Sequence, residues 1–159
     1  MTGTREDVTM EPVALSEGFG LLHRSPSRAS ADVGVVLCSA WGIHELSSRK
    51  MMFQLASRLA AEGLPAIRFD YPGTADAIGS PGEGFETWIE RASGAADRLK
   101  AACGLTRIVF AGLGIGGTVA MLAAGRRDDV AALALMAPVV GGRRYLREIA
   151  LGASMVEQA

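Results

Sequence analysis

The chain has 159 residues, of which 49% are hydrophobic, 6% are aromatic and 20 are glycines. A domain of about this length buries roughly 68–70% of the surface that its unfolded chain exposes, so the sequence predicts one packed core and excludes a disordered chain. The formal net charge is −1 and neither sign of charge is clustered, which excludes a surface charged strongly enough to bind nucleic acid or an anionic membrane.

The N-terminal part of the chain leads into a first predicted strand. Residues 1–18 are largely polar and are expected to form a loose segment, followed by a short extended segment at residues 19–23. Residues 25–32 are rich in Ser, Pro and Asp, which favour turns because they compete locally for backbone hydrogen bonds. Residues 33–38 ("VGVVLC") are a short apolar run, typical of a strand buried on both faces of a parallel sheet.

The first helix is predicted over residues 47–62, with Gly63 just past its end as a C-cap. Its helical spacing is carried by Met51, Phe53 or Gln54, Leu55, Leu59 and Ala60. The pattern repeats with a strand at 64–69, a helix at 85–103, a strand at 107–111, a helix at 115–124 and a strand from Val130 to Val140. Because adjacent parallel strands need crossover connections, this alternation predicts an α/β fold, a doubly wound and mostly parallel sheet with helices on both faces.

Three regions are expected from this pattern. Residues 1–18 are a loose N-terminal segment, residues 19–142 are the α/β core, and residues 143–159 are the start of a helix or cap region. Neither a C-cap nor a further strand follows the last helical segment, so the chain is expected to be truncated after the strand from Val130 to Val140.

A glycine-rich stretch, "GLGIGG", joins a predicted strand to a predicted helix at residues 112–117. Gly112, Gly114 and Gly117 match the G-x-G-x-x-G pattern of dinucleotide-binding loops, in the strand-to-helix context that this pattern requires. That function also needs an acidic residue at the end of the next strand, and "LMAPVV" contains none. A purely structural role, in which the glycines only let strand and helix approach closely, remains open.

The same stretch also fits G-x-S-x-G, the nucleophile elbow of serine hydrolases, except at the nucleophile itself. In this interpretation Gly114 occupies the nucleophile position and supplies the geometry of the turn without the hydroxyl. Gly112, Gly116 and Gly117 meet the need for small residues around it.

Two further stretches resemble a known superfamily. "IRFDYPGTADAIGSP", residues 67–81, resembles the loop after the fourth strand of many α/β-hydrolases, and residues 35–63 resemble their third strand, oxyanion loop and first helix. Together with "GLGIGGTVAMLAA" and "LALMAPVVGGRRYLRE", the chain resembles the N-terminal part of an α/β-hydrolase, nearest the serine-aminopeptidase-like and exosortase-associated branch. The resemblance covers residues 19–148 and implies hydrolysis of esters, thioesters or peptides, with a small acyl compound as substrate.

The resemblance also implies roles for individual residues. It assigns the two oxyanion-binding N–H groups to Trp41 and Ile115, while the Trp41 ring could equally serve as an apolar lid over the end of the sheet. In the second loop the usual glycine and serine are replaced by Ala75 and Ala77, and Asp76 is interpreted as a residue that holds the turn.

The catalytic set is incomplete in this sequence. Acyl transfer needs a nucleophile, a histidine base and an acid that orients it, and in this superfamily the acid and histidine follow the elbow. The sequence has only His23 and His44, both before the elbow, and His44 is interpreted as a solvated loop residue. Cys38 is interpreted as a small core residue. We therefore expect a poor hydrolase or none at all.

The alternative is a binding or assembly module that uses the fold as a scaffold. If the chain ends after its sixth strand, the apolar run that begins at Val130 and ends at Val140 is left as a bare sheet edge, which favours pairing with another chain. A homo-oligomer or a complementing chain is expected at this edge.

Other features predict neither a metal nor a cofactor, because the sequence has no C-x-x-C, no H-E-x-x-H and no carboxylate cluster with ligand spacing. Arg143, Arg144 and Arg147 are interpreted as a solvated helix face. Cys38 and Cys103 lie in apolar stretches of a chain without a secretory signal near its start, which favours free thiols and a cytoplasmic location. The longest apolar run is too short to cross a membrane.

Overall fold

In the computed structural model, residues 8–16, 18–27, 32–74 and 84–157 are described, from residue 152 onward by the backbone alone. The strands are β1 (Thr9–Leu15), β2 (Gly18–Arg24), β3 (Val33–Cys38), β4 (Ala66–Phe69), β5 (Arg107–Leu113) and β6 (Val130–Met136). The helices are α1 (Ile43–Ala61), α2 (Phe85–Cys103), α3 (Ile115–Ala124) and α4 (Gly142–Glu157).

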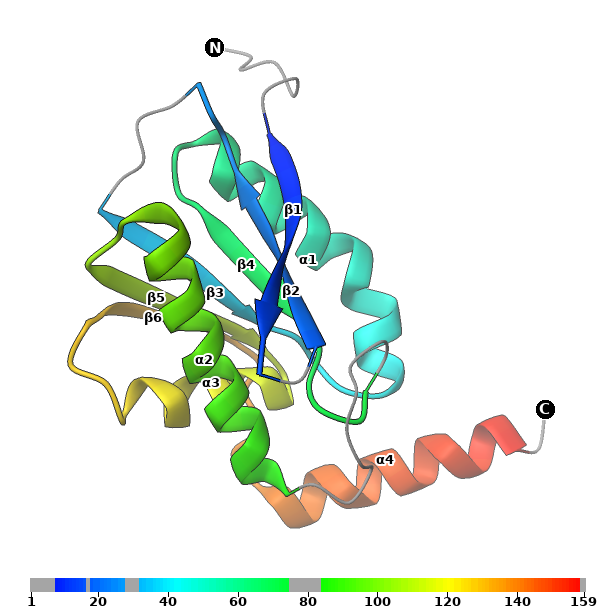
Figure 1. The fold of residues 1–159 in the computed structure, drawn as a ribbon. Helices are drawn as coiled ribbons and strands as arrows, with labels where there is room; N and C mark the ends of the chain where they lie inside the picture. Colours follow the sequence, from blue (N-terminus) through cyan, green and yellow to red (C-terminus); the bar gives the residue numbers. More distant parts are fainter. Residues whose placement is uncertain (1–7, 17, 28–31, 75–83, 158–159) are drawn as a thin grey trace.

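The strands form one mixed sheet in the order β1-β2-β4-β3-β5-β6. β4, β3, β5 and β6 run parallel, whereas β2 pairs antiparallel with both β1 and β4. α1 packs on one face of the sheet, and α2 and α3 pack on the other (Figure 1). This arrangement confirms the predicted α/β class with helices on both faces.

The N-terminal segment departs from its prediction. Residues 1–18 were expected to be loose, but β1 pairs along its whole length with β2, from Thr9 opposite Arg24 to Leu15 opposite Gly18. Only Val13 of this strand is buried, and its other side chains are partly or fully exposed. An edge strand that buries so little shows no continuous apolar run, which is why its sequence resembles a loop.

The first helix begins earlier and turns a different face to the sheet than its spacing predicts. α1 starts at Ile43 instead of residue 47, and its buried side chains are Ser48, Met52, Ala56 and Ala60. Met51 and Phe53, which belong to the predicted helical spacing, are each 43% exposed, whereas Ala60 of the same set is buried. Three of the four buried residues are small and let the helix lie close to the sheet, so packing outweighs the larger apolar side chains in deciding its orientation.

The end of α1 follows the prediction. Gly63 has a positive φ of 84°. Its N–H donates to the Ala60 carbonyl at 2.9 Å, and the Leu64 N–H donates to the Leu59 carbonyl at 2.9 Å. This pair of bonds is the Schellman motif, in which a left-handed glycine satisfies the last helical carbonyls.

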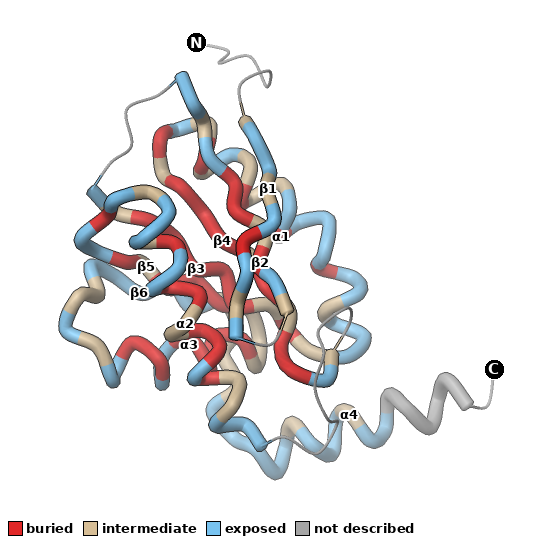
Figure 2. The backbone as a smooth tube through the Cα atoms, viewed as in Figure 1, coloured by how far each residue is buried: buried red, intermediate tan, exposed pale blue. Residues whose placement is uncertain are grey.

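The core lies along the central strands β3, β4 and β5 and the helix faces that cover them (Figure 2). β6 is different, because none of its residues is buried and Leu133 and Leu135 are 43% and 37% exposed. It ends at Met136, earlier than the predicted Val140, because Ala137 takes a positive φ of 46° and Pro138 follows. α4 lies beside the end of the sheet and extends away from it, with Leu146 65% exposed (Figure 1).

The sheet order decides where a site can form. β3 lies between β4 and β5, and the chain leaves β3 toward α1 on one face and β5 toward α3 on the other. The carboxyl ends of adjacent parallel strands whose connections leave toward opposite faces form a crevice, where open α/β sheets bind ligands. The loop after β3 and the glycine turn after β5 flank this crevice.

Candidate active site

The turn between β5 and α3 has the backbone of a nucleophile elbow. Gly114 has φ 58° and ψ −125°, a region that residues with a side chain rarely occupy. Its N–H donates to the Met136 carbonyl at 2.9 Å, and its own carbonyl accepts from the N–H groups of Gly117 at 3.0 Å and Val139 at 3.3 Å. These bonds hold the turn between the end of β6 and the start of α3.

The glycines around this turn differ in whether their neighbours leave space for a β-carbon. A β-carbon on Gly112 would collide with the Gly116 backbone, and one on Gly116 would collide with the carbonyl oxygens of Cys38 and Ser39. One on Gly117 would meet the Pro138 Cβ at 3.1 Å. Close approach therefore explains these three glycines.

Gly114 is the exception among them. A β-carbon there would meet only the Ala40 Cβ, at 3.8 Å, which is ordinary contact. The turn therefore has space for a side chain at the one position where a serine hydrolase carries its nucleophile. Close packing therefore does not account for the glycine at this position, whereas its positive φ of 58° favours one.

The loop after β3 is held against the elbow by two contacts. Gly116 packs directly on the carbonyl of Ser39, and the Tyr71 hydroxyl donates to the same carbonyl at 3.0 Å. Gly42 follows with φ 65° and opens α1. The loop that carries Trp41 is therefore fixed relative to the elbow by backbone packing.

The ring and the backbone N–H of Trp41 have different surroundings. Its ring lies 6.0 Å from the Trp88 ring, which stacks on Tyr71 at 4.5 Å, so the side chain joins an aromatic cluster at the end of the sheet. Within the described residues, neither the Trp41 nor the Ile115 N–H donates to a backbone carbonyl. Ile115 is the first residue of α3, where the N–H groups lack helical partners and the helix dipole favours negative charge.

A cavity of about 280 Å³ lies beside the elbow. The loop after β3 lines one side of it, through Ala40 and Trp41, and the loop after β4 lines the other, through Asp70 and Tyr71. Ala40 is also the residue nearest the space above Gly114. The cavity is therefore next to the position where a nucleophile would stand.

The two histidines do not supply a base to this elbow. His44 is exposed in the first turn of α1, in agreement with its interpretation as a solvated residue. His23 is fully buried, and its Nε2 accepts a hydrogen bond from Arg68 Nε at 3.2 Å. Its Nδ1 lies 3.2 Å from Ser57 Oγ and must carry the proton of the neutral ring, so it donates to Ser57 and cannot activate that hydroxyl. Burial, with a smaller effect of the Arg68 charge, lowers the pKa of His23 from 6.5 to about 4.

Cys38 is excluded as a nucleophile by its surroundings. Its side chain is fully buried at the end of β3, and burial raises the pKa of its thiol to about 12. A thiol that stays protonated is a weak nucleophile. This agrees with the interpretation of Cys38 as a core residue.

The other residues singled out in the sequence lie away from the elbow or outside the described residues. Asp76 lies outside the described residues. Arg143, Arg144 and Arg147 are exposed on α4, and Arg144 pairs with Glu148 at 2.9 Å, as expected of a solvated helix face. In the part of the chain that the structure describes, no cluster of side chains could hold a metal ion, and no helix combines the length and apolarity needed to cross a membrane.

The sequence interpretation missed the aromatic support of the site. Tyr71 and Trp88 are 17 residues apart in the chain (71 to 88), and their rings stack because α2 packs on the sheet against β4. The one local signal is the aromatic pair Phe69 and Tyr71 on either side of the end of β4. Nothing in the sequence links that pair to the loop after β3.

Comparison with known proteins agrees with this geometry. The family model described as serine aminopeptidase, S33, matches residues 31–158. No functionally curated protein matches the sequence significantly.

Solved structures share the fold. A lidless α/β serine hydrolase from Xanthomonas campestris is 19% identical with a TM-score of 0.65, over 86% of this chain and 64% of its own. A dienelactone hydrolase-like promiscuous phosphotriesterase from metagenomic libraries is 19% identical with a TM-score of 0.64, over 83% and 60%. A proline iminopeptidase-related protein from Thermus thermophilus is 17% identical with a TM-score of 0.57, over 84% and 46%.

This chain therefore spans between 46% and 64% of the length of these three structures. At these identities the likeness shows the fold alone. The family match covers most of the chain and includes the elbow, the loop after β3 and the loop after β4. The chain belongs to the serine aminopeptidase S33 family of α/β-hydrolases.

Proposed function

We propose that this chain is a relative of the ester-, thioester- and peptide-cleaving serine hydrolases that forms no acyl-enzyme at its elbow and therefore does not hydrolyse acyl substrates there. The observation that carries the proposal is the open space at Gly114. Packing excludes a β-carbon at Gly112 and Gly116 and is tight at Gly117, but it leaves room for a side chain here, and the chain supplies none.

The surroundings of the elbow support the same proposal. An acyl-enzyme needs a nucleophile and a histidine that takes its proton. In the described residues His23 is occupied by Arg68 and Ser57, and His44 is exposed on α1. The retained features are those that bind, namely the N–H groups of Trp41 and Ile115 and the adjoining cavity.

The direct test uses a fluorophosphonate probe, which labels activated serines, and a p-nitrophenyl ester. We expect no labelling of the purified chain and no ester cleavage above that of buffer. Gly114→Ala serves as a matched control, since it fills the open space without adding a hydroxyl. Stoichiometric labelling of the unaltered chain would contradict the proposal. Digestion and peptide mapping would then identify the serine that carries the label.

A second candidate role is assembly through β6. This strand is the edge of the described sheet, it carries no charged residue and no proline, and all of its residues are partly or fully exposed. Edges with these properties are templates for pairing with another strand. A second copy is the occupant that we propose, because two identical edges can pair antiparallel about a two-fold axis.

Sedimentation velocity tests this second role. We expect a dimer for the unaltered chain and a monomer for the double variant Leu133→Lys and Leu135→Lys. Leu122→Lys is the matched control, since Leu122 is 38% exposed on α3 and is not part of the β6 edge, so this variant should leave the dimer intact. A well-dispersed monomer of the unaltered chain would rule this role out.

A further inference from the structure

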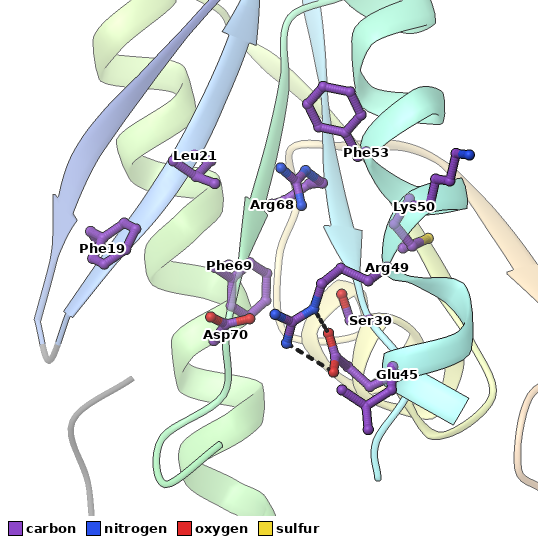
Figure 3. Close-up of a pocket in the computed structure, with 12 residues that line it drawn as sticks. Phe19, Leu21, Ser39, Glu45, Arg49, Lys50, Phe53, Arg68, Phe69 and Asp70 are labelled. Atoms are coloured by element: carbon purple, nitrogen blue, oxygen red, sulfur yellow. Dashed lines mark hydrogen bonds and ion pairs between the residues drawn. The ribbon is translucent and has the colours of Figure 1, made fainter. Parts of the chain in front are cut away.

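A second, larger cavity of about 530 Å³ lies between α1 and the strands β2 and β4 (Figure 3). It shares residues with the smaller cavity beside the elbow, including Ser39, Glu45 and Asp70, so the two form one continuous groove along the first turns of α1. Neither Gly114 nor Ile115 lines this larger part. Its chemistry is therefore set by other residues.

Arg68 is a partly buried charged side chain that lines this groove. It is partly buried on β4, and its guanidinium lies 5.4 Å from the centre of the Phe53 ring. Its Nε donates to the neutral His23 ring, and its Nη2 lies 3.9 Å from the sulfur of Met10. Within the described residues no carboxylate hydrogen-bonds this guanidinium, and Nη1 donates to no protein atom. Partly buried charges are usually paired, because leaving water is costly for an ion.

The neighbouring charges leave Arg68 as the anion-binding group. Arg49 is engaged by Glu45 through two contacts, Nε to Oε1 at 2.8 Å and Nη2 to Oε2 at 3.0 Å (Figure 3). Burial lowers the pKa of Arg68, and the nearby charge of Asp70, which follows β4 and lines the same groove, partly offsets this effect. Because Glu45 and Asp70 are both acidic, a ligand with one negative charge is tolerated better here than a doubly charged phosphate.

The walls of the groove are apolar. Phe19 and Leu21 line it from β2, and Phe53 lines it from α1 on the opposite side (Figure 3). Phe19 and Phe53 are 45% and 43% exposed, so part of their apolar surface is uncovered. Apolar walls with a few convergent polar groups are typical of small-molecule sites, and 530 Å³ lies within their usual range.

We propose that this groove binds an amphiphilic carboxylate, a compound with one carboxylate and an aliphatic or aromatic tail. The carboxylate accepts hydrogen bonds from the free end of the Arg68 guanidinium, and the tail lies between Phe19, Leu21 and Phe53. This binding does not depend on the elbow, so it holds whether or not residue 114 carries a nucleophile.

The test is a calorimetric titration of the full chain with four probes at neutral pH. Octanoate has both required features, 1-octanol has only the tail, octylammonium has the opposite charge, and acetate has only the carboxylate. We expect octanoate to bind at one site and each of the other three to bind at least tenfold more weakly. Absence of octanoate binding, or equal binding of 1-octanol, would overturn the proposal.

Variants then locate the binding to this groove. Arg68→Gln should weaken octanoate binding at least tenfold, whereas Arg58→Gln, which removes an exposed arginine from the other end of α1, should leave it unchanged. Because Arg68 also contacts His23, a thermal melt checks that the variant folds. Phe19→Ser removes an exposed wall residue without touching those contacts and should also weaken binding of octanoate. Unchanged affinity in both folded variants would place the ligand elsewhere and refute the assignment.

Discussion

Gly116 packs directly against the carbonyl oxygen of Ser39, so closely that a single methyl group at residue 116 has no space. This contact joins the first turn of α3 to the loop after β3. The elbow and the proposed oxyanion loop therefore behave as one rigid unit, and the positions of Trp41 and Ile115 depend on a residue that carries no chemistry.

The contact predicts opposite effects for two glycine substitutions. Gly116→Ala should lower the free energy of unfolding by about 1–3 kcal/mol, because the added methyl group must displace backbone. Gly94→Ala is the matched control: it lies inside α2 with open space around it and should raise stability by about 0.5–1 kcal/mol. Urea unfolding measures both. Equal effects would mean that helix propensity, and not packing, decides the outcome at residue 116.

Restoring the hydroxyl at the elbow should restore reactivity but not turnover. Gly114→Ser has room for its side chain, and in the described residues no histidine hydrogen-bonds this turn. We expect slow fluorophosphonate labelling at residue 114 and no catalytic cycling on a p-nitrophenyl ester. Gly114→Ala carries the same backbone strain and no oxygen, so it should stay unlabelled. Repeated turnover by the serine variant would show that a base is available.

The buried His23 predicts a specific dependence of stability on pH. Its pKa falls from 6.5 to about 4 on folding, so the folded state favours the neutral ring. Its contribution to stability is complete above about pH 6.5 and is lost progressively as the pH falls toward about 4, because the unfolded chain takes up the proton first. Urea unfolding across this range should show the loss.

His23→Gln is the variant that isolates this effect. A glutamine can still accept from Arg68 and donate to Ser57, but it does not titrate. The stability difference between the unaltered chain and the variant should therefore shrink as the pH falls from about 6.5 to about 4. A difference that stays constant over this range would contradict a neutral, buried His23.

A network of charges at the opposite end of the sheet should contribute to stability. Arg127 Nη2 contacts Asp129 and Asp97, each at 2.7 Å, and its Nη1 donates to the Ser93 carbonyl at 3.3 Å. Hydrogen bonds from Arg127, with further bonding from Lys100, lower the pKa of Asp129. Arg127→Ala should cost about 1–3 kcal/mol, as expected for charged hydrogen bonds that are only partly solvated.

The neighbouring arginine provides the comparison for this network. Arg126 pairs with Glu86 on the surface, where the two side chains are 49% and 58% exposed. Exposed ion pairs contribute little, so Arg126→Ala should leave the unfolding midpoint unchanged. If both variants proved equally stable, the Arg127 contacts would be no stronger than those of a surface pair.

Much of the fold follows from local patterns. The helices at Phe85–Cys103 and Ile115–Ala124 lie where their spacing predicts, and Gly63 ends its helix with the positive φ expected of a C-cap glycine. These features depend on residues close together in the chain. β1 was not predicted, and the buried face of α1 was predicted only in part, because both depend on what packs against them rather than on their own hydrophobicity.

Some features of the candidate site also follow from the sequence, whereas others depend on the tertiary structure. The sequence by itself determined the order of strands and helices after β1, the glycine at the nucleophile position and the family, since each is a local pattern of residue types. Only the tertiary structure decided which glycines packing requires, that Tyr71 and Gly116 hold the loop after β3, and that Arg68 lies between Phe53 and His23 with no hydrogen bond to a carboxylate of the described residues. The physical reason is that each of these contacts joins atoms far apart in the chain, whose approach is set by the stacking of helices on the sheet.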